Sequence, residues 1–302
     1  MDKLIINAAI TGMVPRKADN ATVPVRGDEI VAEARRVYDG GATVIHVHAR
    51  DDAEDPTYER SVYEPIIQGI REACPGMIIS GSTSGRKHKL FEQRSEVLGC
   101  QPDLGSLTVG SLNFPKQASI NEPKMIQALA TAMREAGIVP EMEFFDLGMV
   151  DYARDFLVPR GFIDGPLYCN ILLGSLGTAA ATPRNLVAMV DALPEGTTWS
   201  ATGIGRFQFS INCLAIAMGG HVRVGLEDNL WMDEERTVAA TNTSLIERVV
   251  GVAESMGRQI ANAEEAREII GLPKRPAAAE RGQAGPPPPP QPGARPQPRF
   301  AH

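Results

Sequence analysis

The sequence predicts an α/β protein of the (β/α)8 type, a TIM barrel in one domain. Its 302 residues are enough for such a barrel, which typically needs about 250. Short apolar or β-branched runs alternate with amphipathic segments, which is the pattern of parallel βαβ units. Eight runs qualify as strands, at 4–10, 43–49, 77–82, 103–109, 139–145, 167–173, 197–202 and 222–226.

The segments between these runs have the periodicity of helices. Segment 30–38 places apolar residues at the spacing of a helix that buries one stripe. Segment 121–137 repeats the pattern, and Gly137 is placed to end that helix. Thr182 before Pro183 is an N-cap signal for a later helix.

The interiors of the strands distinguish a closed barrel from an open doubly wound sheet. In the last run, apolar residues alternate with Arg223 and Gly225, and in the second run they alternate with His46 and His48. A sheet covered on both faces should be more uniformly apolar. In a barrel the apolar face packs on the helices, and polar groups at the carboxyl ends of the strands meet at one mouth. The alternation favours the barrel.

Composition narrows the possible partners. The net charge of −7 disfavours nucleic acid. No apolar run approaches the roughly 20 residues of a membrane span, and the N-terminal run is too short for a secretory signal. The four cysteines include no CxxC pair, so neither a thiolate metal site nor a disulfide framework is expected. These features predict a cytoplasmic protein with no nucleic-acid or membrane partner.

A proline-rich tail follows the predicted barrel. We place the barrel at residues 1–272 and the tail at 273–302, where nine prolines follow Lys274. Such a segment cannot hold a helix or a strand ladder, so we expect it to be disordered. It would serve either as a docking peptide or, the interpretation we favour, as an extension without a function of its own.

The first candidate site is the His46-Val47-His48 motif, which ends an apolar strand and is followed by Arg50. Side chains at i and i+2 of a strand share a face and lie about 7 Å apart along the chain, so both imidazoles can reach one ion. The alternative is a pair of hydrogen-bonded histidines without a metal.

The second candidate site is the segment GGHVRVGLEDN at 219–229. Glu227 shares the inward parity of Arg223 and would complete a His2Glu zinc site with open positions for a substrate. Asp228 would lie just outside it, where Arg223 can orient it. Taken alone, an Arg–Glu–Asp group is more often a structural salt-bridge network.

Further polar groups lie near other strand ends. Hydroxyls at a barrel mouth suit a substrate carboxylate, although they also cap backbone groups. Arg206, in the segment TGIGR, is a candidate for binding phosphate or for stabilising a helix terminus. The remaining candidates are Ser82, Thr83, Ser106, Thr108, Glu141 and Glu143.

In order and spacing these motifs resemble the β-keto acid cleavage enzymes. The founding member of that family is the 3-keto-5-aminohexanoate cleavage enzyme of lysine fermentation. The likeness runs from about Leu4 to Leu272 and excludes the tail. It implies a zinc-containing (β/α)8 barrel in amino acid metabolism, assembled as a homo-oligomer, with a tetramer as the expected size. The matching segments are NAAITGMVPRKADN, GATVIHVHARDD, STSGR, VGSLNFP, VPEMEFFDLGMV, TWSATGIGRF and GGHVRVGLEDN.

The resemblance implies roles for individual residues. His46, His48 and Glu227 would bind Zn²⁺, and the Arg223–Asp228 pair would move the proton. The implied reaction deprotonates C2 of a β-keto acid, attacks acetyl-CoA, transfers CoA to the keto carbon and ends in retro-Claisen cleavage. Its products are acetoacetate and a new acyl-CoA.

The implied substrate contacts include one informative departure from the family. Ser82 and Glu143 match as they stand, whereas Ser106 replaces a threonine and Thr108 an asparagine of the aminohexanoate enzyme. Val14 stands where that enzyme has a glutamate for the substrate ammonium. Because a buried ammonium would have no partner there, we expect a neutral or apolar keto acid tail.

Three other classes compete with this interpretation. A metal-dependent acyl-CoA lyase or aldolase of the same fold would not need acetyl-CoA. An amidohydrolase-type barrel would need further histidines from later strands, and His88 and His221 are poorly placed for that. A non-catalytic barrel would use the tail for docking, which the His46, His48, Glu227 and Asp228 set argues against.

Overall fold

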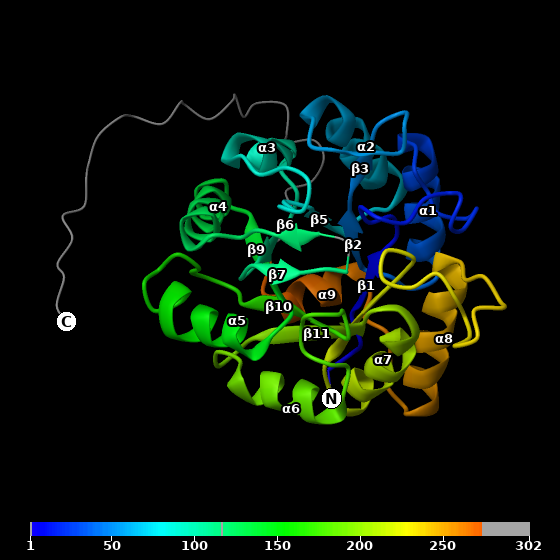
Figure 1. Ribbon diagram of the computed structural model, residues 1–302. Helices are drawn as coiled ribbons and strands as arrows, with labels where there is room; N and C mark the ends of the chain where they lie inside the picture. The colour runs from blue at the N-terminus through cyan, green and yellow to red at the C-terminus, as the bar shows by residue number, and fades with distance from the viewer. Residues whose placement is uncertain (1, 116, 274–302) are drawn as a thin grey trace, which may run out of the picture. The chain divides into compact units, whose positions relative to one another are not determined.

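The structure, a computed structural model, describes residues 2–115 and 117–273. Eight parallel strands close into one barrel, in which the first strand pairs with both the last and the second (Figure 1). The predicted barrel is confirmed, and each predicted strand overlaps an observed one. Around the barrel the strands run β1 (Ile6–Ala9), β12 (His221–Val224), β11 (Thr198–Gly203), β10 (Tyr168–Leu173), β9 (Val139–Phe144), β6 (Leu104–Thr108), β5 (Ile78–Gly81) and β2 (Val44–Val47).

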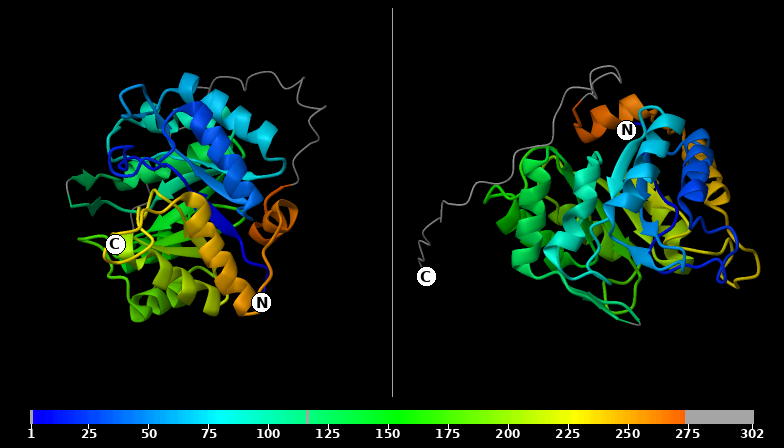
Figure 2. Two further views of the ribbon diagram at one scale, coloured as in Figure 1. Left: turned by 90° about the vertical axis from the view of Figure 1, so that its right-hand side faces the viewer. Right: turned by 90° about the horizontal axis from the view of Figure 1, so that it is seen from above.

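Helices surround the barrel (Figure 2). The predicted segment 30–38 lies in α1 (Gly27–Asp39), and segment 121–137 includes α4 (Pro123–Glu135), which Gly137 follows with a φ of +68°. The hydroxyl of Thr182 accepts the amide of Asn185 at 3.3 Å and caps α6. The helices are α1 (Gly27–Asp39), α2 (Arg60–Ala73), α3 (Phe91–Ser95), α4 (Pro123–Glu135), α5 (Leu147–Tyr152), α6 (Pro183–Ala192), α7 (Gln208–Ala217) and α8 (Asn242–Ser255).

Apolar side chains close the end of the barrel where the strands begin. A ninth helix, α9 (Ala263–Ile270), contributes Ala266 and Ile270 to this plug. It packs on a buried cluster from the strand beginnings, formed by Ile5, Val44, Ile78, Leu104 and Tyr168. Among the described residues, this plug leaves the opposite end of the barrel for a polar site.

Short hairpins and turns lie at that opposite end. One hairpin pairs β3 (Ala49–Arg50) with β4 (Pro56–Thr57), and the other pairs β7 (Leu112–Asn113) with β8 (Ala118–Ser119). They follow the second and fourth barrel strands and add side chains beyond the strand ends.

The predicted tail at 274–302 lies outside the described residues, so both its disorder and the boundary at 272 remain predictions. Within the part of the chain that the structure describes, no helix combines the length and the apolar character needed to cross a membrane.

Candidate active site

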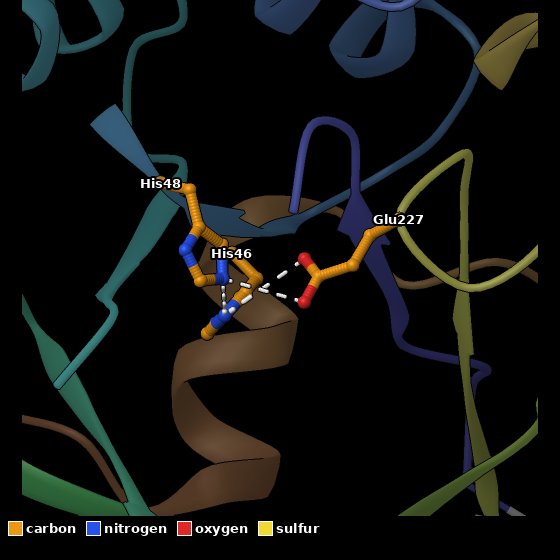
Figure 3. Close-up of side chains that lie close together, drawn as sticks. All are labelled: His46, His48 and Glu227. Carbon is orange, nitrogen blue, oxygen red and sulfur yellow. Dashed lines mark hydrogen bonds and ion pairs between the residues drawn. The ribbon is translucent and has the colours of Figure 1, made fainter. Parts of the chain in front are cut away.

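Three side chains with metal-binding atoms meet at the open end of the barrel (Figure 3). His46 lies on β2, His48 follows it, and Glu227 comes from the turn after β12. The Nε2 atoms of the two imidazoles are 3.1 Å apart. One carboxylate oxygen of Glu227 is 3.3 Å from His48 Nε2, and the other is 4.0 Å from His46 Nε2. The fold thus brings together all three predicted ligands.

The strand that leads to Glu227 ends earlier than predicted. β12 stops at Val224, whereas the sequence suggested a strand to residue 226. Gly225 has a φ of +153°, and a Cβ there would lie 2.1 Å from the carbonyl oxygen of Ala9. The chain turns at this glycine, and the Glu227 amide donates to Ala9 at 3.0 Å. Glu227 therefore reaches the site from a turn, and not because it alternates with Arg223 along one strand.

Gly12 lies directly against the Glu227 side chain. Its φ is +66°, and an added Cβ would lie 2.5 Å from Glu227 Cγ. We expect Gly12→Ala to push the carboxylate away from the histidines. The affinity for Zn²⁺ should fall by about 10- to 100-fold, the usual cost of disturbing the support of a metal site. Equilibrium dialysis against buffered zinc, read by atomic absorption, measures this.

Gly137 provides a matched control for that variant. Its φ of +68° is nearly the same, but no described atom lies within 4 Å of an added Cβ. Gly137→Ala therefore imposes a similar backbone strain, about 1–2 kcal/mol, without touching the site. Equal zinc affinity in the two variants would refute the positioning role of Gly12.

Arg223 links three carboxylates inside the barrel, although it is only 1% exposed. Its Nε donates to Asp228 at 2.8 Å, and its Nη2 lies 2.9 Å from Glu227. Its Nη1 lies 3.5 Å from Glu143, which also accepts the Thr108 hydroxyl at 2.7 Å. The predicted Arg–Glu–Asp group is one buried charge network that extends from β12 to Glu143 on β9.

Burial and charge shift the pKa values of this network in opposite directions. Burial disfavours the charged form of Arg223, but Asp228 and then Glu227 outweigh it and hold the pKa well above its ordinary value. Burial would raise the pKa of Glu227, yet Arg223 and the imidazoles keep it well below its usual range. For Asp228 burial prevails over Arg223, so its pKa is raised. In this network an ionised Glu227 therefore lies beside Asp228, the carboxylate with the higher pKa.

Glu141 lies behind His46 in the barrel interior and is completely buried. Its Oε2 lies 3.6 Å from His46 Nδ1. Asn7 donates to it at 2.6 Å, and Asn170 and Ser80 also donate to it. His46 Nδ1 has no hydrogen bond among the described residues, so Glu141 acts on the ring through its charge at this distance. The sequence identified Glu141 only as a strand-end carboxylate, and the structure gives it this supporting position.

The donor set fits a divalent metal ion. One oxygen of Glu227, Oε2, is buried and has no hydrogen-bond partner among the described residues. Burial lowers the pKa of His48 to about 4, so its imidazole is neutral, the form that binds metals. An ion would satisfy the unpaired oxygen and both imidazoles. Two imidazoles and one carboxylate are typical of zinc sites that keep open positions.

The cluster opens into a cavity of about 1060 Å³ at the carboxyl ends of the strands. Ser106 does not line it, since Ser106 is buried and its Oγ accepts the Thr83 amide at 3.1 Å. Ser106 therefore supports the turn after β5, and its role as a substrate contact remains a prediction. Thr83 and Glu141 do not line it either, and the predicted site residues that do are Val14, His46, His48, Ser82, Thr108, Glu143, Arg206, Arg223, Glu227 and Asp228.

Two of these residues lie at the open rim. Val14 is 53% exposed, and Arg206 is exposed with its guanidinium 4.9 Å from the ring centre of Phe207. Val14 would exclude a substrate ammonium only where water is absent. Because water reaches Val14, that exclusion is weaker than the sequence suggested.

Arg50 has a role that sequence reasoning missed. Its guanidinium donates to the carbonyl of Gly12 at 2.9 and 2.6 Å and to that of Pro15 at 2.9 Å. It therefore fixes the loop that carries Val14. Its place beside the His-x-His motif was the only signal, because carbonyl acceptors leave no trace in a sequence.

The other two histidines singled out in the sequence lie apart from the cluster. His221 begins β12, and its Nδ1 accepts the amide of Ile5 at 3.0 Å. His88 lies in a loop, where its Nε2 is 3.2 Å from the carbonyl of Pro56. Neither joins the three residues that can share a metal, which agrees with the argument against an amidohydrolase-type site.

A closed parallel barrel with a polar cavity and buried charges at the carboxyl ends of its strands defines a (β/α)8-barrel enzyme. The chain belongs to the β-keto acid cleavage enzyme family, whose model matches residues 3–272. It is 41% identical to the 3-keto-5-aminohexanoate cleavage enzyme of Fusobacterium nucleatum, over 91% of this chain and 100% of that protein.

Two further relatives extend the comparison. The 3-oxoadipate:acetyl-CoA acetyltransferase of Cupriavidus necator is 37% identical over 89% of this chain and 95% of that protein. A solved structure described as a ternary complex of ObcA with C4-CoA adduct and oxalate matches with a TM-score of 0.71. That match has 20% identity and covers 83% of this chain and 68% of the other, so it supports the fold alone.

Proposed function

We propose that this chain exchanges acyl groups between a β-keto acid and acetyl-CoA, releasing acetoacetate and a new acyl-CoA. The observation that carries the proposal is the contact between the Arg223–Asp228 pair and the His46, His48 and Glu227 cluster in one cavity. The relative named for 3-oxoadipate:acetyl-CoA acetyl transfer supports acetyl-CoA as the second substrate, and the relative named for 3-keto-5-aminohexanoate cleavage supports a β-keto acid as the first.

His46, His48 and Glu227 would hold the metal, and their donor types favour Zn²⁺. When bound, the ion supplies a Lewis acid that favours loss of the C2 proton of the β-keto acid. Glu141 keeps His46 oriented for this purpose, and Arg223 keeps Glu227 ionised. The homo-oligomer expected from the family remains a prediction.

Asp228 removes the proton from C2, while Arg223 holds its carboxylate in place. The C2 carbanion attacks the carbonyl carbon of acetyl-CoA, a C–C bond forms, and CoA leaves as the thiolate. The thiolate then attacks the original keto carbon, the bond from that carbon to C2 breaks, and Asp228 returns the proton to C2. The acetyl group has moved to C2 and the original acyl group to sulfur, so atoms and charge balance.

The remaining lining residues bind the two substrates. Ser82, Thr108 and Glu143 lie near the reacting centre and contact the β-keto acid. Arg206 lies at the exposed rim, where a cation suits a CoA phosphate. Val14 borders the tail of the keto acid.

Carbon labelling tests this function. With acetyl-CoA labelled by ¹³C in both acetyl carbons, we expect both labels in acetoacetate and none in the new acyl-CoA, as measured by mass spectrometry over a panel of β-keto acids. Cleavage without acetyl-CoA would instead identify an acyl-CoA lyase or aldolase. No turnover of any β-keto acid by zinc-loaded protein would favour a non-catalytic barrel.

A further inference from the structure

Arg86 is a partly buried cation that the proposed chemistry does not use. It lies in the loop after β5 and lines the cavity, and its guanidinium carbon is 3.5 Å from the ring centre of Phe114. Its Nε is buried and has no hydrogen-bond partner among the described residues. None of the ion pairs within the described chain includes it. A buried guanidinium nitrogen without a partner is costly, and an anionic ligand that pairs with the guanidinium would offset this cost.

The loop that carries Arg86 is anchored before any ligand binds. Arg94 beneath it donates from Nε to the carbonyl of Thr83 at 2.8 Å and from Nη2 to Asn121 at 2.8 Å. A Cβ on Gly85 would lie 2.5 Å from Arg94 Nη1, so glycine allows this close packing. Stacking on Phe114 then orients the guanidinium plane, which lowers the entropic cost of binding an anion.

The other cavity arginines are paired or open to water. Arg223 is occupied by the carboxylates of the centre, and Arg16 pairs with Asp55 at 2.5 Å. Arg206 and Arg236 are exposed at the rim. Burial lowers the pKa of Arg86, and the carboxylates of the centre offset this only in part. Arg86 is therefore the cavity arginine best placed to pair with an enclosed anion.

The position of Arg86 indicates which anion it meets. It packs on Phe114, next to the β7–β8 hairpin, and forms no ion pair with Glu143, Glu227 or Asp228. Arg86 therefore lies outside the ion-pair network of Arg223, and a substrate group that pairs with it lies on the side of the cavity where Phe114 is. The thioester end of acetyl-CoA has no charge, and its phosphates suit the exposed arginines at the rim.

We propose that Arg86 determines specificity by binding a carboxylate at the far end of the β-keto acid, so that the substrate class is a short dicarboxylic 3-oxo acid. This inference rests on the proposed function and replaces the neutral or apolar tail expected from Val14. An arginine fork can bind a carboxylate through two parallel hydrogen bonds. Val14, with no carboxylate of its own, does not repel such a tail.

Steady-state kinetics with 3-oxoadipate and 3-oxohexanoate, which differ only in the terminal carboxylate, test the inference. The wild type should prefer the diacid in kcat/KM by about 10- to 100-fold, the size of a charge-assisted contact. Arg86→Met retains the packing on Phe114 but removes the charge. The variant should lose the preference for the diacid because its KM for the diacid rises. The variant should leave kcat, kcat/KM for the monoacid and KM for acetyl-CoA nearly unchanged. Arg86→Lys, which keeps the positive charge, should recover part of the lost preference.

Arg206→Met at the rim is the matched control and should not change the preference between the two acids. If Arg86→Met instead raised KM for acetyl-CoA, Arg86 would be a CoA phosphate contact and the inference would be wrong. A wild type that prefers the monoacid also overturns it, even if Arg86→Met fails to fold. Absence of acetoacetate from every keto acid is a different result, because it refutes the proposed function itself.

Discussion

Purified His46→Ala protein is expected to contain almost no zinc and to have no measurable acetoacetate formation. The variant removes one of three ligands whose donor atoms lie within 4.8 Å of one another. It also leaves Glu141 without the imidazole it faces at 3.6 Å. The loss of zinc affinity should therefore exceed the roughly 10- to 100-fold typical of changes outside the ligand shell. Metal analysis and turnover of the same preparation measure both quantities.

His88→Ala is the matched control for this variant. It removes a histidine near the same end of the barrel, where His88 contacts only the carbonyl of Pro56 and the ring of Tyr58 among the interactions described. It should keep about one zinc per chain and normal turnover. If His46→Ala retained zinc with full activity, the proposed metal centre would be wrong.

Asp228→Asn is expected to keep zinc and to lose turnover by about 10²- to 10⁴-fold, the usual contribution of a general base. The amide has nearly the same shape as the carboxylate, and Arg223 keeps two other carboxylates, Glu227 and Glu143. The metal ligands are therefore undisturbed. Parallel assays of kcat and zinc content separate this outcome from that of His46→Ala.

Proton exchange at C2 provides a direct readout of the base. In D2O, wild-type protein should catalyse exchange of the C2 protons of a β-keto acid, followed by NMR, and Asp228→Asn should not. Exchange at the wild-type rate in Asp228→Asn would assign the base to another residue. Loss of zinc from the variant would instead make Asp228 part of the support of the metal site.

Much of the fold followed from local patterns. Every predicted strand overlaps an observed one, because alternation of side chains between two faces is a property of each strand by itself. The same rule placed His46 on the inner face together with Arg223. The rule was less accurate after β12, where the chain turns at Gly225. Glu227 lies beyond that turn, so the alternation of side chains along the strand does not explain why it reaches the site.

Periodicity and motifs of a few neighbouring residues were enough to predict the barrel, the family and the candidate ligands. The folded chain was needed to show that Gly12 packs on Glu227, that Glu141 lies behind His46, and that Arg86 stacks on Phe114. Each of these contacts joins residues brought together by closure of the barrel or packing of its loops. Packing and desolvation depend on distances in space, which local sequence periodicity does not specify.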